Sequence, residues 1–366
     1  MVTEEQVRQA LKGVMDPEIG RPIEDIGMLE SIKIDGGRVE VHVLLTIEGC
    51  PLKDRITTDV TAAVQPLEGV DHVDVRLTPM SQQQREGLVS TLRGGAPTPQ
   101  QKIQFPDSTS VIAVASGKGG VGKSSVTVNL AAAMAADGRK VGILDADVWG
   151  FSVPRMLGVA GKPVGFENMI LPLEGYGVKV ISMGFFVPED TPVIWRGPML
   201  HKAIEQFLGD VYWGDLDFLL CDLPPGTGDV SISLASFLPG ASMLVVTTPQ
   251  EAARTVAERA GRMAERTNLR PIGVVENMSW FVCPHCGERE TIFGSGGGQE
   301  AANHLDVPLM AQVPLMPAMR EGGDTGSPIV VSHPDSPAGV ALREAAEAVA
   351  RATKSKVGKP LSLLTT

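Results

Sequence analysis

The stretch VIAVASGKGGVGKSS, residues 111–125, decides the fold of this chain. It opens with five apolar residues rich in β-branched side chains, a composition that predicts a buried strand. A glycine-rich turn follows, and residues 126–136 are mostly small or apolar, which predicts a helix. Residues 117–124, GKGGVGKS, match the P-loop pattern of two glycines four residues apart followed by Lys-Ser. The sequence therefore predicts a phosphate-binding turn between a strand and a helix.

The residue types in this turn suit a nucleoside triphosphate such as ATP. Glycines let backbone N–H groups surround an anion, and the N-terminus of the following helix adds its dipole. Lys123 is predicted to reach the β- and γ-phosphates, and the Ser124 hydroxyl is predicted to bind Mg²⁺. The residues expected to contact the nucleotide here are Gly117, Lys118, Gly119, Gly120, Val121, Gly122, Lys123, Ser124 and Ser125.

The same turn contains a second pattern. Gly117, Gly119 and Gly122 also match the dinucleotide-binding fingerprint, and Asp145 ends the next predicted strand, where a ribose-binding acid would lie. We favour the P-loop, because a triphosphate requires the Lys-Ser pair and a dinucleotide does not. An acidic residue suited to Mg²⁺ also occurs further along the chain.

Lys118, directly after the first glycine, narrows the class of P-loop protein. GKGGVGKS resembles the deviant Walker A motif of the MinD, ParA and nitrogenase iron-protein class of ATPases. The resemblance implies a dimer that sandwiches ATP, with Lys118 of one subunit reaching the phosphates bound by the other. Lys118 and Lys123 are then both catalytic, and Lys118 acts like an arginine finger supplied in trans.

Length and composition limit the class of protein. With 366 residues the chain has room for two domains, and its net charge of −11 argues against non-specific nucleic-acid binding. It has no run of about 18 apolar residues, and its polar N-terminus does not resemble a signal peptide, so no membrane association is expected. Four unevenly spaced cysteines do not form a disulfide framework, which favours a reducing, cytoplasmic setting.

The chain is predicted to be an α/β protein in which residues 1–93 form a small α/β domain, residues 94–108 a linker and residues 109–366 a P-loop domain. Alternation of strands and helices in the last part predicts a doubly wound, mainly parallel sheet. In the first domain, the predicted elements are a helix from a Thr3 cap to about Met15 with Gln6 as capping-box partner, strands 28–34, 38–47 and 73–77, and a helix 51–64. In the second, they are strands 111–115, 141–144, 218–221, 243–248, 272–275 and 308–314, and helices 126–136, 251–267, 299–304 and 337–353.

Cys50 precedes Pro51 at the start of a predicted helix, where a thiol is exposed and its pKa is lowered. The alternative is a buried cysteine that acts as a small hydrophobe. DPEIGRPIEDIGM (residues 16–28), a hairpin ending at Thr46 and the sequence Gly-Cys-Pro around Cys50 resemble the small iron–sulfur assembly domain, found alone or fused to Mrp-type ATPases. The resemblance implies a functional Cys50.

Three aspartates follow predicted strands of the second domain. Asp222 ends an apolar strand, which is the Walker B pattern of a carboxylate that binds Mg²⁺ or its water. Asp145 and Asp147 follow the strand 141–144 in DADVWG, which resembles the switch I region of the MinD/ParA class. The resemblance implies that Asp147 orients or activates the attacking water and that Asp145 supports the Mg²⁺ shell. Helix capping is the alternative for one of them.

Asn277 and a pair of cysteines lie near the end of the strand 272–275. An amide group can donate and accept hydrogen bonds at the same time, so Asn277 is predicted to pair with the edge of an adenine ring. Asn277 also matches the base-recognition position of the ATPase family that this chain resembles. Cys283 and Cys286 form a C-P-x-C-G motif with no second C-x-x-C in the chain. Because zinc and iron–sulfur sites usually need four ligands, we expect a site shared across a twofold axis. A structural zinc and a redox dithiol remain alternatives.

The whole chain resembles the Mrp/ApbC family. Five motifs occur in the family's order, GKGGVGKSS, DADVWG, DLPPGTGD, ENMSW and CPHCG. The resemblance implies a homodimeric ATPase that binds ATP, Mg²⁺ and a labile [4Fe–4S] cluster and serves iron–sulfur apoproteins and scaffold proteins. Two alternatives are a positioning ATPase of the MinD/ParA type and a zinc-stapled nucleotide switch. Acidic charge, the CPHCG stretch and an alanine-rich C-terminal helix count against the first of these.

Overall fold

The structure is a computed structural model in which two compact units are distinguished. The first unit comprises residues 1–101 and 164–171, and the second comprises residues 102–163 and 172–366. Residues 164–171, expected within the second domain, therefore group with the first unit. The described residues are 2–17, 19–46, 52–92, 105–106, 108–147, 150–166, 169–186, 197–226, 229–238, 240–250, 253–283 and 285–353. Cys50 and most of the predicted linker lie outside them.

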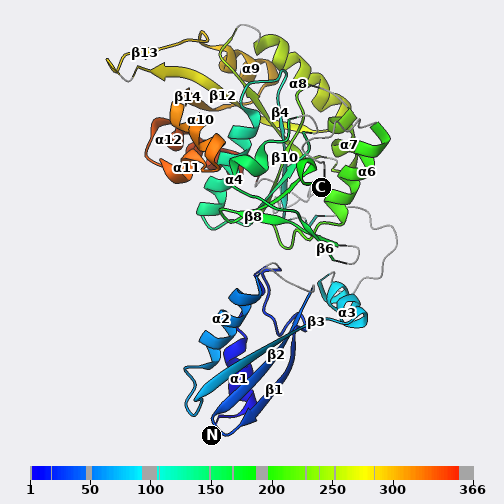
Figure 1. The fold of residues 1–366 in the computed structure, drawn as a ribbon. Coiled ribbons are helices and arrows are strands. Elements are labelled where there is room, and N and C mark those ends of the chain that lie inside the picture. Colours follow the sequence, from blue (N-terminus) through cyan, green and yellow to red (C-terminus); the bar gives the residue numbers. More distant parts are fainter. Residues whose placement is uncertain are drawn as a thin grey trace, which may run out of the picture. The chain divides into compact units, whose positions relative to one another are not determined.

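The first unit is built on a three-stranded sheet in the order β1-β2-β3. β1 and β2 form an antiparallel hairpin, whereas β3 runs parallel to β2, so α2 makes the crossover between them. Both α1 and α2 pack on this sheet and bury one apolar side each (Figure 1). The elements are α1 (Glu4–Leu11), β1 (Leu29–Asp35), β2 (Arg38–Leu45), α2 (Lys53–Val64), β3 (His72–Pro79), α3 (Gln82–Leu92), β6 (Val164–Phe166) and β7 (Met169–Leu171).

The first helix has the predicted capping box but is shorter than predicted. Thr3 Oγ1 accepts a hydrogen bond from the Gln6 N–H at 3.3 Å, and Gln6 Oε1 accepts one from the Thr3 N–H at 2.9 Å. The helix ends at Leu11 rather than near Met15, because Gly13, a poor helix former, follows closely. The helix α3 is absent from the prediction, since its polar sequence QQQREGLVSTL has little apolar periodicity.

A nine-stranded sheet forms the centre of the second unit, confirming the predicted doubly wound, mainly parallel α/β fold. The strand order is β13-β12-β11-β4-β10-β5-β9-β8, and β14 pairs with β12 on the same sheet. All neighbours run parallel except β13 and β8, which are antiparallel to theirs. The strands are β4 (Ser110–Ala115), β5 (Val141–Asp145), β8 (Leu173–Gly175), β9 (Val178–Ser182), β10 (Phe218–Asp222), β11 (Ser242–Thr247), β12 (Arg270–Val282), β13 (Arg289–Glu290) and β14 (Leu309–Leu315).

Helices cover both faces of this sheet, with α4 and α12 on one side and α7 and α8 on the other (Figure 1). Several of these helices, including α6, α7 and α10, are absent from the prediction. The helices are α4 (Lys123–Ala136), α5 (Val153–Met156), η1 (Met183–Phe185), α6 (Gly197–Gly209), α7 (Asp229–Phe237), α8 (Ala253–Thr267), α9 (Gly297–Leu305), α10 (Pro317–Thr325), α11 (Ile329–Ser332) and α12 (Pro337–Thr353). No helix in the described ranges is both long and apolar enough to cross a membrane.

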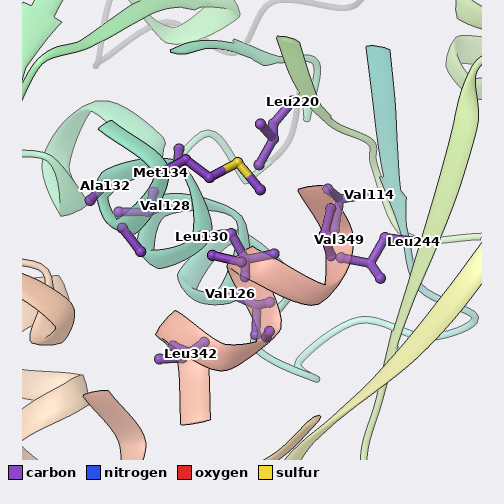
Figure 2. Packing of buried hydrophobic residues seen from close by; sticks show 14 of the residues in the cluster. Val114, Val126, Val128, Leu130, Ala132, Met134, Leu220, Leu244, Leu342 and Val349 are labelled. Carbon is purple, nitrogen blue, oxygen red and sulfur yellow. The ribbon is translucent and has the colours of Figure 1, made fainter. Parts of the chain in front are cut away.

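The helix α4 lies inside the unit rather than on its surface. Its sequence is apolar or small on nearly every side, as expected for a helix buried all round. Figure 2 shows Val126 and Leu130 of α4 beside Leu342 and Val349 of α12, all within one buried cluster. The sheet covers the other side of α4. Packing on both sides fixes the start of α4, and therefore the P-loop, against the sheet.

Candidate functional site

The P-loop connects β4 to α4, and two of its glycines have backbone conformations that other residues rarely adopt. Gly120 has a φ of 77° and Gly122, the residue before α4, has a φ of 78°. A Cβ at Gly122 would lie 2.2 Å from Asn277 Nδ2, so the neighbouring side chain also requires glycine here. The same amide nitrogen donates a hydrogen bond to Val121 O at 2.9 Å. Asn277 of β12 therefore packs directly against the P-loop.

Asp222, the last residue of β10, is the centre of a buried polar cluster beside the P-loop. Its Oδ1 lies 2.6 Å from Lys123 Nζ and accepts a hydrogen bond from Thr127 Oγ1 at 2.9 Å. Its Oδ2 accepts a hydrogen bond from Ser124 Oγ at 2.5 Å. The predicted residues Lys123, Ser124 and Asp222 thus lie together. Thr127 was missed, although its place one helical turn after Lys123 is a usable signal.

The donor set at Asp222 fits a magnesium ion. Mg²⁺ takes oxygen ligands and is usually held by one or two carboxylates together with substrate phosphates. The Ser124 hydroxyl and the Asp222 carboxylate lie side by side, and the Asp145 carboxylate comes from the adjacent strand β5, in register with Asp222. In the described part of the chain no group of three or more His, Cys, Asp or Glu side chains could hold a metal.

Asp145 is fully buried and holds a proton more tightly than an ordinary carboxyl group. Its Oδ2 accepts a hydrogen bond from Ser182 Oγ at 2.9 Å, and its Oδ1 accepts one from the Asp147 N–H at 3.2 Å. Burial, followed by repulsion from Asp222, nevertheless raises the pKa of Asp145 from 3.8 to about 8. Two neighbouring carboxyl groups, one of them paired with Lys123, therefore share this edge of the sheet.

We expect Asp145→Asn to remove a pH dependence of stability from the metal-free protein. Between pH 4 and 8 the folded wild type keeps the Asp145 proton that the unfolded chain loses. The wild-type free energy of unfolding should therefore fall as pH rises, by at most about 1.4 kcal/mol per pH unit. The asparagine variant lacks this slope. Urea unfolding of both proteins with EDTA at pH 5 and pH 8 measures it, and parallel pH dependences would contradict the expectation.

Asp147 and a cavity lie on the nucleotide side of the sheet. Asp147 is 9% exposed, and its Oδ1 accepts a hydrogen bond from the Gly150 N–H at 3.1 Å.

A cavity of about 300 Å³ opens next to Gly122 and Asn277, and this volume is at the lower end of the range for small-molecule pockets. Its lining includes Met156, Met278, Met316 and Met319. The methionines make part of this lining flexible and apolar, which suits a flat ring such as a nucleobase. The cavity was not predicted from the sequence.

Lys118 contacts its own chain in this structure. Its ammonium donates a hydrogen bond to Gln250 Oε1, in the loop between β11 and α8. Arg259 of α8 contacts the same part of the P-loop, since its Nη1 donates to Gly117 O at 3.2 Å. Neither Gln250 nor Arg259 was predicted, because only the sheet order brings their segment next to the P-loop.

Cys283 and Cys286 lie at the tip of a hairpin formed by β12 and β13, which projects from the unit (Figure 1). The Cys283 N–H donates to Glu288 O and its carbonyl accepts from the Gly287 N–H, both at 2.9 Å. Cys283 is half-buried and Cys286 is exposed. The backbone N–H groups of Cys286 and His285, in that order, lower the pKa of the Cys283 thiol. The tip therefore favours a thiolate, the form that binds metal.

The strand β12 carries this tip and also touches the nucleotide site. It is longer than the predicted strand 272–275, because it continues past Asn277 to Val282. Its register with β14 shifts between Asn277 and Phe281, and Met278 within that break has a φ of 60°. The Arg289 guanidinium lies 3.6 Å from the centre of the Trp280 ring and so links β13 to β12.

Cys221 is a core residue. It is fully buried in β10 and its pKa is raised by burial and then by the neighbouring Asp222. A thiol in this state is a poor metal ligand, so the accessible thiols among the described residues are Cys283 and Cys286.

Comparison with known proteins agrees with this geometry. A family model described as "NUBPL iron-transfer P-loop NTPase" matches residues 107–350, and one described as "Iron-sulfur cluster assembly protein" matches residues 4–77. The iron-sulfur cluster carrier protein of Mycobacterium leprae is 52% identical over 98% of this chain and 95% of its own length. The protein of the same name from Synechocystis is 43% identical over 96% of this chain and 98% of its own length.

Two solved structures are similar to part of this chain. The nucleotide-binding protein of Archaeoglobus fulgidus, in complex with ADP, is 40% identical with a TM-score of 0.54, covering 60% of this chain and 88% of its own. The septum site-determining protein MinD of Pyrococcus horikoshii, with Mg-ADP, is 26% identical with a TM-score of 0.51, covering 66% and 96%.

The fold and the site define a P-loop NTPase of the MinD and ParA structural class. Within that class, this chain belongs to the family of iron–sulfur cluster carrier P-loop NTPases. The predicted resemblance to the Mrp/ApbC family is therefore confirmed, including the match of residues 4–77 to an iron–sulfur assembly domain.

Proposed function

We propose that this protein binds and slowly hydrolyses ATP as a homodimer, carries a labile [4Fe–4S] cluster between its two subunits and transfers it to apoproteins. The observation that carries the proposal is the course of β12. The strand places Asn277 against the P-loop and continues directly into the hairpin that holds Cys283 and Cys286. One strand thus connects a nucleotide site to a pair of accessible thiols.

The roles of the nucleotide-site residues follow from charge and position. Lys123, released from Asp222 by a better anion, neutralises the transferred phosphoryl group, while the P-loop N–H groups hold the phosphates. Ser124, Asp222 and Asp145 hold Mg²⁺, which supplies charge neutralisation between the phosphates when bound. Asp147 orients the attacking water from the neighbouring strand end. Catalysis of this kind is positioning and electrostatic stabilisation, which agrees with a slow enzyme.

Adenine recognition is assigned to the cavity beside Asn277. The methionine lining provides the apolar faces for the ring, and polar groups at the rim provide orientation. The Asn277 amide N–H already donates to Val121 O, so its carbonyl oxygen is the atom left to accept from an amino group.

Cluster binding follows from the number of thiols. Each chain offers Cys283 and Cys286 at one exposed tip, and a [4Fe–4S] cluster takes four cysteines, so two chains complete one site. A cluster held by two projecting hairpins is open to solvent and to an acceptor protein. Such exposure suits a cargo that is given away. Cys50 of the first unit is proposed to handle cluster or iron before transfer, and scaffold proteins are proposed as donors.

The alternatives are less well supported. Similarity to the MinD structure extends over the P-loop unit, whereas the curated relatives that match nearly the whole chain are named cluster carriers. A zinc-stapled nucleotide switch would use the same two cysteines. It differs from the proposal in the metal bound and in the absence of transfer.

Anaerobic reconstitution with iron and sulfide tests the proposal. We expect a brown protein with about four irons and four sulfides per dimer, because four thiolates suit one [4Fe–4S] cluster. Mixing with an iron–sulfur apoenzyme should then restore the activity of that enzyme while the colour of the carrier fades. One tightly bound zinc per dimer with refusal of iron under the same conditions would replace the proposal by the zinc-stapled switch.

A further inference from the structure

The hydrogen bond between Lys118 and Gln250 is a contact that the nucleotide chemistry does not require. β11 is the parallel neighbour of β4, with Val245 opposite Ala115. The segments that follow the two strands therefore leave the sheet at the same edge. This brings Gln250 Oε1 to the ammonium of Lys118, and the described residues offer Lys118 no carboxylate partner.

The acceptor of this hydrogen bond is held by the framework. A Cβ at Gly297 would lie 2.6 Å from Pro249 O and 2.9 Å from Gln250 O, so the start of α9 rests directly on this backbone. The next N–H, that of Gly298, donates to the buried Glu276 carboxylate of β12 at 2.5 Å. The backbone of Gln250 thus packs on the start of α9, which is itself bonded to β12. Lys118 reaches Gln250 with a long, flexible side chain, so it is the lysine ammonium that can move away.

The two lysines of the P-loop are held in different ways. Lys123 is buried, 6% exposed, and paired with the Asp222 carboxylate. Lys118 is half-buried and is held by a neutral amide. A hydrogen bond between a cation and a neutral acceptor is weaker than one between a cation and an anion. An anion that reaches Lys118 therefore displaces Gln250 readily. The phosphates bound by the same chain already have Lys123 as their cation, so they need Lys118 less.

On the basis of the proposed ATP-dependent dimer, we infer that Gln250 is a positioning residue that holds Lys118 against its own subunit until a nucleotide-loaded partner subunit supplies a phosphate for it. Each dimer that forms must open two of these hydrogen bonds. Gln250 thereby sets the protein concentration at which the two-subunit site assembles. Lone subunits keep the lysine away from their own nucleotide.

Two variants of opposite effect test the inference. In the presence of Mg²⁺ and a non-hydrolysable ATP analogue, Gln250→Leu should lower the dimer dissociation constant by about tenfold or more, because the acceptor is lost from both subunits. Gln250→Glu should raise it by a similar factor, because the amide becomes a carboxylate that pairs with Lys118. Sedimentation measures both constants. Equal dissociation constants for wild type and both variants would overturn the inference. Shifts of the same sign in both variants would also overturn it, because they would indicate altered loop packing rather than a changed partner for Lys118.

A second measurement tests the hydrogen bond between Lys118 and Gln250 in the lone subunit. In nucleotide-free protein at low concentration, an amine-reactive reagent followed by mass spectrometry should modify Lys118 faster in Gln250→Leu than in wild type. Gln299→Leu, an exposed glutamine on α9, is the matched control and should change neither readout. In a Lys118→Ala background the two Gln250 variants should have equal dimer constants. If wild type and variants alike fail to dimerise, the proposed dimer is wrong. If Lys118 is labelled at equal rates in wild type and Gln250→Leu, the inferred role of Gln250 in holding Lys118 is wrong.

Discussion

Replacing either Cys283 or Cys286 by alanine is expected to abolish cluster binding, reducing reconstituted iron from about four per dimer to the level of a blank. Each substitution removes two of the four thiolates that a symmetric dimer offers. ATP hydrolysis should continue, because the polar cluster around Asp222 contains no residue of the hairpin. Iron and sulfide analysis with visible absorption spectra measures the loss, and an ATPase assay on the same sample measures the retained activity.

Cys221→Ala is the matched control for these variants. It also removes one thiol, but from a fully buried position in β10 where burial raises the thiol pKa. Its iron content should equal that of wild type, with some loss of stability from the small cavity. Full iron occupancy in Cys283→Ala would show that the ligands lie elsewhere, and Cys50 would then be the next thiol to test.

Lys123→Ala is expected to lower the rate of ATP hydrolysis by about 10³-fold or more, since a cation directed at the transferred phosphoryl group is lost. The same change leaves Asp222 buried beside Asp145 without its cation, and loss of one partner of a buried pair costs about 3–5 kcal/mol. Thermal unfolding should therefore show a lower midpoint in the nucleotide-free protein. Steady-state phosphate release measures the rate.

Two further variants separate catalysis from folding. Lys123→Gln keeps a hydrogen-bond donor near Asp222 and should be more stable than the alanine variant while remaining inactive. Asp147→Asn keeps the shape of a side chain that contacts Gly150, so it should bind a fluorescent ATP analogue like wild type but hydrolyse ATP far more slowly. Wild-type turnover in Asp147→Asn would remove Asp147 from the proposed mechanism.

The parts of the site that were predicted are those encoded by local patterns. Lys123 and Ser124 follow from the P-loop spacing, and Asp222 follows from an apolar strand that ends in a carboxylate. A parallel sheet brings the strand ends to one edge, and β10 lies next to β4, so these separately predicted residues lie together. The buried helix α4 was predictable for a related reason, because apolar residues on every side indicate cover on every side.

The residues that were missed depend on strand order or on strand length. Gln250 reaches Lys118 only because β11 lies next to β4, and Ser182 reaches Asp145 only because β9 lies next to β5. The length of β12 was missed because polar residues in ENMS interrupt its apolar run. Hydrogen bonds to Gly298 of α9 and to Val121 of the P-loop compensate for the burial of Glu276 and Asn277, which a pattern of apolar residues does not reveal.

The register break in β12 separates the part of the strand that contacts the P-loop from the part that carries the thiols. Asn277 lies on the P-loop side of the break, and Phe281 and Cys283 lie on the other side. The six residue-to-residue steps from Asn277 to Cys283 span roughly 20 Å when extended, so a turn of about 10° at the break displaces the thiol by about 3 Å. Such a displacement exceeds the length of an iron–sulfur bond. In the proposed dimer, a small rotation at Met278 would be enough to change which thiols reach a common cluster, while the contact of Asn277 with the P-loop stays in place.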